Sequence, residues 1–348
     1  MEKLQKKFHW STFLYGFLAL ILVLLSLSLI VVYFFPHTNP TLQGLVRRLP
    51  YPAVVVGYGN VVTFRELSQN MESIKHFYEN QDSSQLGLRI DFSTEEGQKR
   101  LKVREKEVLN KMIEDEAVIR LAKERGVFIS QEMARQGVAR KLEEYGNSDQ
   151  VQQNLERLYG WSLSDFEEKV VVPSLYEEKL NELFQKEVDP NAEAKEKIEK
   201  AAEALRKGAS FSDVVKQYSQ GQTADAGGDL GWFTLEDLAP ELRSPVTLQK
   251  VGVPSNVIES SLGFHIILVE EVKKEGNKQL YRIKQIFARK ETFADWLSEK
   301  MRTMPLWVFD PDYRFDAATA RIEFRDPEWQ KFEEELYKKA SGDPSFLL

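Results

Sequence analysis

The pattern of hydrophobic and polar residues divides this 348-residue chain into an apolar start, a long helical region and a mixed region of helices and strands. No Asp, Glu, Lys or Arg occurs between Lys7 and Arg47, and residues 13–35 within this gap form one apolar run. At 1.5 Å per residue, about 20 helical residues span the roughly 30 Å hydrocarbon core of a bilayer. The pattern therefore predicts a cytoplasmic tip and a transmembrane helix within residues 1–36.

A cleaved signal peptide is the main alternative for this segment. Its apolar part usually has about 7–15 residues and ends at a small-residue cleavage site. The run at 13–35 is longer and ends in the sequence YFFP, which offers no such site. Lys3, Lys6 and Lys7 precede the run, and the positive-inside rule then places the N-terminus in the cytoplasm. We therefore expect an uncleaved single-pass anchor, with the bulk of the chain in a periplasm or at a cell surface.

A linker at residues 37–50 and a helical domain at residues 51–188 are expected to follow the anchor. The domain begins with a predicted hairpin, in which two Val-rich runs flank Gly57–Asn60. After it, apolar residues recur every three or four positions, which is typical of helices with one buried face. Helices are expected over residues 65–80, 95–125, 130–145, 149–158 and 164–184.

The pattern changes after Pro190 to an α+β module, which we place at residues 189–290. Two helices and a glycine-rich loop are expected first, and two strands then follow. The helices are predicted over 192–207 and 211–218, and the strands over 265–269 and 280–287. The last segment, residues 291–348, is expected to contain short strands at 306–309 and 321–324 and a helix over 326–339.

Composition narrows the function classes. Hydrophobic residues make up 42% of the chain and charged residues 29%, which rules out a fully disordered or multi-span membrane protein. The absence of cysteine excludes disulfides, thiolate metal sites and thiol nucleophiles, and four histidines leave little material for a metal centre. A net charge of −7 argues against nucleic acid as a partner. A hydrolase finds no support either, since no G-x-S-x-G motif occurs. No cofactor or metal is expected.

Three stretches of the α+β module resemble the parvulin-type (PpiC) peptidyl-prolyl cis-trans isomerases. They are FSDVVKQYS at 211–219, GGDLGWF at 227–233 and GFHIIL at 263–268. The resemblance implies an FKBP-like α+β domain with rotamase activity. It also implies a substrate, the X–Pro peptide bond, whose isomerisation crosses a barrier of roughly 18–20 kcal/mol and is slow enough to limit folding. An apolar cup for the proline ring and polar groups that favour the twisted amide are sufficient for this reaction.

The helical domain is similar to the N-terminal domain of SurA-type chaperones. The similarity is carried by the hairpin, by Phe64-Arg65-Glu66-Leu67 and by the stretch from Ile113 to Gly126. With a membrane anchor, the arrangement is similar to that of PpiD or PrsA. The resemblance implies unfolded or newly exported polypeptides as partners. By analogy, residues 305–340 are expected to pack near the hairpin at 53–64.

The resemblance assigns site residues only in part. His265 matches the family's strand-borne histidine and is assigned as catalytic, although a histidine with only a core-packing role remains an alternative. Gly221 stands where the family usually has Asp or Cys, and Ala239 stands where it usually has Gln. The residues assigned to substrate binding are apolar and form the cup that the resemblance implies; they are Leu230, Phe233, Leu238 and Leu242.

The family's first strand, with its His-Ile-Leu-Val signature, is absent before the helix at Ala192. Residues 282–288 fit this pattern, with Gln285 in the histidine position, so Gln285 is assigned as the second catalytic residue. We expect residues 280–288 to form an antiparallel hairpin with 265–271 and to fill the vacant place in the sheet, since an empty place would expose a strand edge. The alternative is a truncated second repeat, because TFADW at 292–296 echoes SFSDV at 210–214.

Two functions remain open. The first is a membrane-anchored, extracytoplasmic peptidyl-prolyl isomerase that assists the folding of exported proteins. The second is a catalytically weak or inactive parvulin-like holdase that binds unfolded exported chains. Gln285 cannot act as an imidazole and Gly221 has no side chain, so the sequence leaves the choice between them open.

Overall fold

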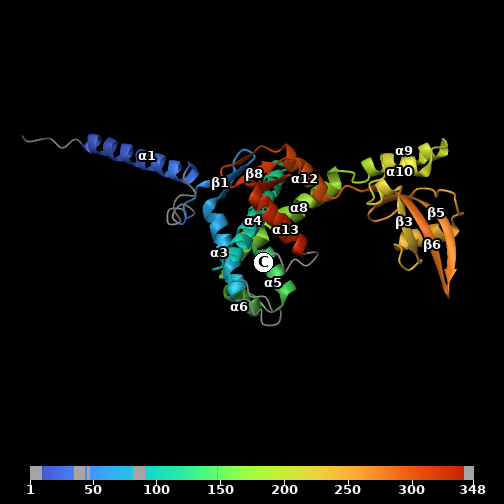
Figure 1. Ribbon diagram of the computed structural model, residues 1–348. Coiled ribbons are helices and arrows are strands. Elements are labelled where there is room, and N and C mark those ends of the chain that lie inside the picture. The colour runs from blue at the N-terminus through green and yellow to red at the C-terminus, as the bar shows by residue number, and fades with distance from the viewer. Residues whose placement is uncertain (1–9, 35–43, 45–47, 81–90, 147, 341–348) are drawn as a thin grey trace, which may run out of the picture. The chain divides into compact units, whose positions relative to one another are not determined.

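The computed structural model describes residues 10–34, 44, 48–80, 91–146 and 148–340. The chain forms two compact units (Figure 1): one comprises Met1–Leu180 with Ser298–Leu348, the other Asn181–Leu297. Both contain helices and sheet, so the fold is of the α+β class. The observed borders, at 180/181 and 297/298, differ from the expected ones at 188 and 290. Each observed border lies inside a helix, Val172–Glu187 or Phe293–Thr303. Pro190 follows the end of the first of these helices, whereas the contacts change inside that helix, between Leu180 and Asn181.

The first unit contains an N-terminal helix, a helical region and three short β-ladders formed by segments from both sides of the second unit in sequence. Its elements, including two helices shared with the second unit, are α1 (Trp10–Phe34), β1 (Pro52–Val56), β2 (Asn60–Thr63), α3 (Phe64–Asn80), α4 (Glu95–Glu124), α5 (Gln131–Tyr145), α6 (Ser148–Tyr159), α7 (Leu163–Phe166), the π-helix η2 (Glu167–Val171), α8 (Val172–Glu187), α12 (Phe293–Thr303), β7 (Leu306–Val308), β8 (Tyr313–Asp316), β9 (Arg321–Phe324) and α13 (Pro327–Ala340).

Helix α1 covers most of the apolar run that the sequence predicts to be a helix. Its leucines are exposed, as at Leu14 and Leu22. Within the part of the chain that the structure describes, no helix is long and apolar enough to cross a membrane. The transmembrane assignment of residues 13–35 stays a prediction. The expected cytoplasmic tip before residue 10 and most of the linker at 37–50 lie outside the described residues.

The end of the chain returns to the start of the first unit. Strand β7 pairs antiparallel with β1, with Val54 opposite Val308, so the sheet has the order β2-β1-β7. The next residue, Phe309, donates its backbone N–H to the Ala53 carbonyl at 2.8 Å. A segment about 250 positions away in sequence therefore completes the hairpin's sheet.

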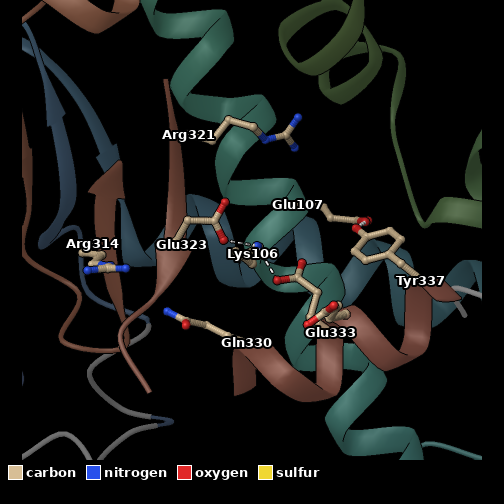
Figure 2. Close-up of a pocket in the computed structure, with 9 residues that line it drawn as sticks. Lys106, Glu107, Arg314, Arg321, Glu323, Gln330, Glu333 and Tyr337 are labelled. Atoms are coloured by element: carbon tan, nitrogen blue, oxygen red, sulfur yellow. Dashed lines mark hydrogen bonds and ion pairs between the residues drawn. The ribbon is translucent and has the colours of Figure 1, made fainter. Parts of the chain in front are cut away.

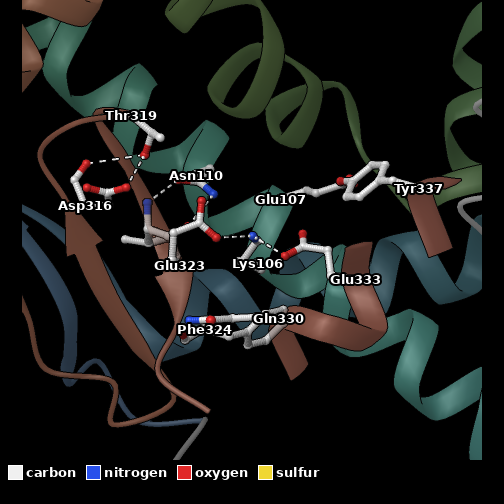
Figure 3. A network of polar contacts seen from close by, with 11 residues as sticks. Lys106, Glu107, Asn110, Asp316, Thr319, Glu323, Phe324, Gln330, Glu333 and Tyr337 are labelled. Carbon is white, nitrogen blue, oxygen red and sulfur yellow. Dashed lines mark hydrogen bonds and ion pairs between the residues drawn. The ribbon is translucent and has the colours of Figure 1, made fainter. Parts of the chain in front are cut away.

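Helix α4 also holds the returning segment, through polar side chains that are almost completely buried (Figure 3). The Asn110 side chain accepts the Ile322 N–H at 2.8 Å and donates to the Ile322 carbonyl at 3.3 Å. One turn away, the Lys106 ammonium lies between the carboxylates of Glu323, at 2.8 Å, and Glu333, at 2.6 Å. Buried polar groups need such partners, so these contacts define how β9 and α13 sit on α4.

The second unit is a four-stranded antiparallel sheet in the order β3-β6-β5-β4. Its elements are α9 (Ala192–Arg206), α10 (Phe211–Tyr218), the 3-10 helix η3 (Ala224–Ala226), β3 (Asp229–Phe233), α11 (Pro240–Leu248), β4 (Ile258–Glu259), β5 (Gly263–Glu275) and β6 (Lys278–Arg289). The hairpin expected between residues 265–271 and 280–288 is confirmed, since β5 and β6 pair along their length, with Ile267 opposite Gln285. Strand β6 lies between β3 and β5 and is therefore an interior strand.

The echo between TFADW and SFSDV has a local explanation. Thr292 and Asp295 form a capping box before α12, in which each side chain accepts the other's backbone N–H. Before α10, the Ser210 hydroxyl likewise accepts the Asp213 N–H at 3.1 Å. Both stretches are helix starts with the same capping chemistry. Helix capping therefore accounts for the similarity of the two stretches without a second copy of the domain.

Candidate functional site

The two faces of the β5–β6 hairpin have different coverings because side chains alternate along a strand. Ile266 and Ile286 point to the face covered by α9 and α10. Ile267 and Ile283 point to the opposite face, where they pack with residues of α11. His265, Gln285 and Phe287 have the same parity as this second pair. The structure thus brings the two residues assigned as catalytic to one face of the sheet.

His265 is buried, with 5% of its surface exposed, and both ring nitrogens have a partner. The Gln285 amide nitrogen lies 3.1 Å from Nδ1, and the Ser260 hydroxyl lies 2.7 Å from Nε2. The Ser260 hydroxyl is also 3.2 Å from the Gly263 carbonyl. An amide N–H donated to Nδ1 leaves the imidazole proton on Nε2, which donates to Ser260 Oγ, and Ser260 donates to Gly263. This chain of bonds is complete with a neutral imidazole.

Electrostatics agree with the neutral form. Burial lowers the pKa of His265 from 6.5 to about 4, and the Glu241 carboxylate opposes this only in part. Burial disfavours the charged form of a base. At neutral pH, His265 is therefore a hydrogen-bonding group without charge, and the site has no general acid in the imidazolium form.

The glycine-rich loop positions Gln285. The Gln285 N–H donates to the Gly228 carbonyl at 2.9 Å. Gly228 has a φ of +80°, and a Cβ there would lie 2.5 Å from the Gln285 carbonyl oxygen. Only glycine fits this close approach without strain. The double glycine of the family-like stretch at 227–233 thus has a structural role directly beside the site.

The four residues assigned to substrate binding belong to one apolar cluster. Leu238 and Leu242 are buried in it, while Leu230 and Phe233 are partly buried and pack against it. Ile267 and Ile283 of the hairpin complete the same cluster, so it adjoins His265 and Gln285 along their strands.

Gly221 lies near the site but contributes no side chain. A Cβ built there would lie 3.7 Å from the Cβ of Phe287 and 3.5 Å from the Ser219 hydroxyl. An Asp or Cys at this position would have its Cβ close to Phe287, whose ring lies beside His265. Because the position is glycine, the polar groups described at the site are those of His265, Gln285 and Ser260.

Two contact residues of the site escaped the sequence analysis. Ser260 bonds to His265, and the Phe287 ring lies 4.8 Å from the imidazole, centroid to centroid, at an interplanar angle of 30°. The signal for Phe287 was present, since it follows Gln285 by two residues and must share its face. Ser260 precedes the strand in a turn, and no periodicity marks such a residue.

Comparison with known protein families assigns the second unit. Residues 179–271 match the family described as "Rotamase: PPIC-type PPIASE domain". This part of the chain is a parvulin-type peptidyl-prolyl cis-trans isomerase domain. The match ends at residue 271, before strand β6, so the strand that carries Gln285 lies outside it.

Curated relatives point the same way. "Chaperone SurA" of Chromobacterium violaceum is 33% identical over 115 residues, which are 31% of this chain and 27% of the relative. "Chaperone SurA" of Methylobacillus flagellatus is 36% identical over 119 residues, which are 32% of this chain and 27% of the relative. The chain thus spans about a quarter of the length of these relatives.

Among solved structures, a peptidylprolyl isomerase, PrsA, from Bacillus anthracis is 20% identical, with a TM-score of 0.20. That likeness covers 67% of this chain and 97% of the other.

Proposed function

We propose that this protein is a peptidyl-prolyl isomerase and chaperone that assists the folding of exported polypeptides. One observation carries the proposal: a neutral, buried His265, bonded on both sides, lies on the same sheet face as an apolar cluster. The family match of the same unit and the resemblance to SurA chaperones support it.

The chemistry needs no nucleophile, because the C–N bond of the X–Pro peptide only rotates. In the proposed reaction, the proline ring packs against the cluster around Leu238 and Leu242, which holds one side of the bond. The twisted amide no longer shares electrons between carbonyl and nitrogen, so it is stabilised by polar groups that are already oriented. His265, Gln285 and Ser260 form such a preorganised group, and no proton needs to move.

The test is a protease-coupled prolyl isomerisation assay with the full chain and a proline-containing tetrapeptide. We expect a rate above that of buffer, and a loss of about tenfold or more in kcat/KM for His265→Ala. His76→Ala is the matched control, because His76 lies in the other unit, on α3. A wild-type rate equal to that of buffer would refute the isomerase.

A holdase is the second candidate, and the absence of side-chain chemistry at Gly221 and of an imidazole at residue 285 favours it. Such a protein would bind unfolded chains through its helical region. Suppression of client aggregation by His265→Ala, undiminished relative to the wild type, would support a holdase that does not depend on isomerisation. Loss of both activities together in that variant would argue against a separate holdase.

We also propose that residues 13–35 anchor the protein in a membrane with the bulk of the chain on the extracytoplasmic side. The charge-free gap and the exposed leucines of α1 support this. The end of α1 is joined to the folded part, since the Tyr33 hydroxyl donates to the Pro52 carbonyl at 2.9 Å. The protein should resist extraction from membranes by alkaline carbonate, and replacing Leu22 and Leu24 by Asp should release it. Release of the wild-type protein would contradict the anchor.

A further inference from the structure

A pocket of about 530 Å³ lies in the first unit, between α4, the β8–β9 hairpin and α13 (Figure 2). Its size is within the usual range for ligand sites. Charged residues of both signs make up most of its lining. None of the assigned isomerase residues contributes to it.

Most of the lining charges are already paired. Lys106 bonds to both Glu323 and Glu333. Glu107 accepts a hydrogen bond from the Tyr337 hydroxyl and forms an ion pair with Arg104 at 2.6 Å. Glu107 is balanced by Arg104, whereas the single ammonium of Lys106 leaves one negative charge on its pair of carboxylates.

Two arginines of the lining differ. Arg314 of β8 and Arg321 of β9 are exposed, and no carboxylate among the described residues is within ion-pair distance of either. The strand register places an acid directly opposite each of them, Glu323 and Asp316.

Both of these acids are engaged elsewhere (Figure 3). Glu323 accepts from Lys106. Asp316 accepts the Ala318 N–H at 2.9 Å and the Thr319 hydroxyl at 3.2 Å. The two guanidinium groups therefore keep their donors and their charge for another partner, and a guanidinium stays charged at any physiological pH.

We propose that this pocket binds a carboxylate of a polypeptide client through the guanidinium group of either Arg314 or Arg321, which lie apart from each other in Figure 2. The inference rests on the proposed function, since it takes the ligand from the unfolded chains that the protein assists. A planar guanidinium matches a carboxylate in a two-bond geometry. The carboxylate comes from an acidic side chain or from a chain terminus, which share this chemistry.

The lining favours a peptide over a phosphate group. The four carboxylates of the lining, those of Glu107, Glu323, Glu333 and Glu334, exceed its three cations by one charge, so they repel a dianion more strongly than the single charge of a carboxylate. A peptide carries only one charge per carboxylate and also brings backbone N–H groups. Carboxylate oxygens of the lining can accept these N–H groups, so both kinds of charged lining residue gain a partner.

The experiment measures binding of three fluorescent tetrapeptides to the full chain by anisotropy. All three have the form acetyl-Ala-Ala-Xaa-Ala: one has Glu and a C-terminal amide, one has Gln and a free C-terminus, and one has Gln and an amide. We expect saturable, salt-sensitive binding of at least one of the first two, which identifies the source of the carboxylate, and at least tenfold weaker binding of the third. Equal binding of all three would overturn the inference.

Variants locate the site. Arg314→Gln with Arg321→Gln should weaken binding of the acidic peptide at least tenfold, whereas Arg302→Gln, an exposed arginine of α12 outside the pocket, should change it less than twofold. Isomerase activity of the double variant should be unchanged, which separates this site from the proposed isomerase site. Unaltered peptide binding in the double variant, or displacement of the peptide by inorganic phosphate at equal concentration, would overturn the proposal.

Discussion

At the scale of single residues, the proposed isomerase site depends on which groups His265 contacts. The imidazole is buried, neutral and hydrogen-bonded to Gln285 and Ser260. In the proposed reaction it acts as a fixed hydrogen-bonding group and keeps its protonation state. This geometry is compatible with both interpretations of the sequence, a catalytic histidine and a core-packing histidine, because the imidazole is buried and also lies on the face of the proposed site. Two predictions belong to this scale: one concerns the protonation of His265, and the other concerns its hydrogen bond to Gln285.

The protonation of His265 predicts a particular pH dependence of stability. With a folded pKa of about 4 against 6.5 in the unfolded chain, the folded state binds fewer protons between these values. The contribution of this residue to stability is therefore lost as pH falls from 6.5 to 4, with a slope of up to about 1.4 kcal/mol per pH unit. The unfolding free energy of the wild type, measured relative to His265→Gln, should fall over this range. A difference that does not vary with pH would contradict the prediction.

We expect the hydrogen bond from the Gln285 amide to His265 Nδ1 to affect isomerase activity. Gln285→Leu removes the donor to Nδ1, so the Nε2–H tautomer loses its support, and we expect roughly tenfold lower isomerase activity. The ¹⁵N shifts of the imidazole should show a mixed tautomer population. Gln279→Leu, at the exposed far end of the same strand, is the matched control. Equal activities and an unchanged tautomer in both variants would remove Gln285 from the site.

At the scale of elements, strand β6 decides whether the second unit is complete. It is an interior strand, hydrogen-bonded to β3 on one side and β5 on the other, although it follows both in sequence. Without it, the inner edges of β3 and β5 would be unpaired and Ile266 would lose its neighbour on the covered face. The family match ends before this strand, but the physical domain extends through it.

Ile286 tests this dependence. The side chain is completely buried in the cluster under α9 and α10, and Ile286→Ala should cost about 2–5 kcal/mol of unfolding free energy. Gln279→Ala on the exposed part of β6 should cost much less. Denaturant unfolding followed by tryptophan fluorescence provides the measurement. A loss below about 1 kcal/mol for Ile286→Ala would show that β6 adds little to the core.

At the scale of the whole molecule, the first unit is closed by its two distant ends. Strand β7 pairs with β1, and α4 holds β9 and α13 through Lys106 and Asn110. Chain segments on either side of the second unit thus share one core. Stability of the first unit should therefore depend on residues that lie more than 200 positions apart in sequence.

Lys106 provides the test at this scale. Lys106→Ala leaves the carboxylates of Glu323 and Glu333 facing each other with no cation between them, and we expect a loss of about 3–5 kcal/mol. Lys111→Ala on the exposed side of α4 should cost less than about 1 kcal/mol. Adding Glu323→Gln and Glu333→Gln to Lys106→Ala should restore part of the loss, because it removes the repulsion. Urea midpoints followed by circular dichroism measure all of these, and equal losses for the two lysine variants would contradict the prediction.

Local pattern was sufficient for much of the architecture. Apolar periodicity predicted the helices of the first unit, and Gly57–Asn60 predicted the turn of its first hairpin, because these signals act within a few residues. The α+β class follows from the change of pattern after Pro190, whereas the pairing of β5 with β6 is predicted from the resemblance, because residues 282–288 fit the pattern of the family's missing first strand and a tight turn joins them to 265–271. Strand β3 and helix α11 were not placed, since short elements with glycine or internal proline carry weak signals.

The sequence by itself determined that the second unit is of parvulin type and that His265 and Gln285 are its candidate polar pair. Only the tertiary structure decided that the two share a face, that Ser260 bonds to His265 and that the Phe287 ring lies beside the imidazole at a tilt. It also decided that Arg314 and Arg321 have no acidic partner within ion-pair distance in the described part of the chain. The physical reason is the same throughout. The sequence gives the chemical type of each residue, whereas its burial, its protonation and the hydrogen-bonding groups that stay without a partner depend on neighbours that only folding brings together.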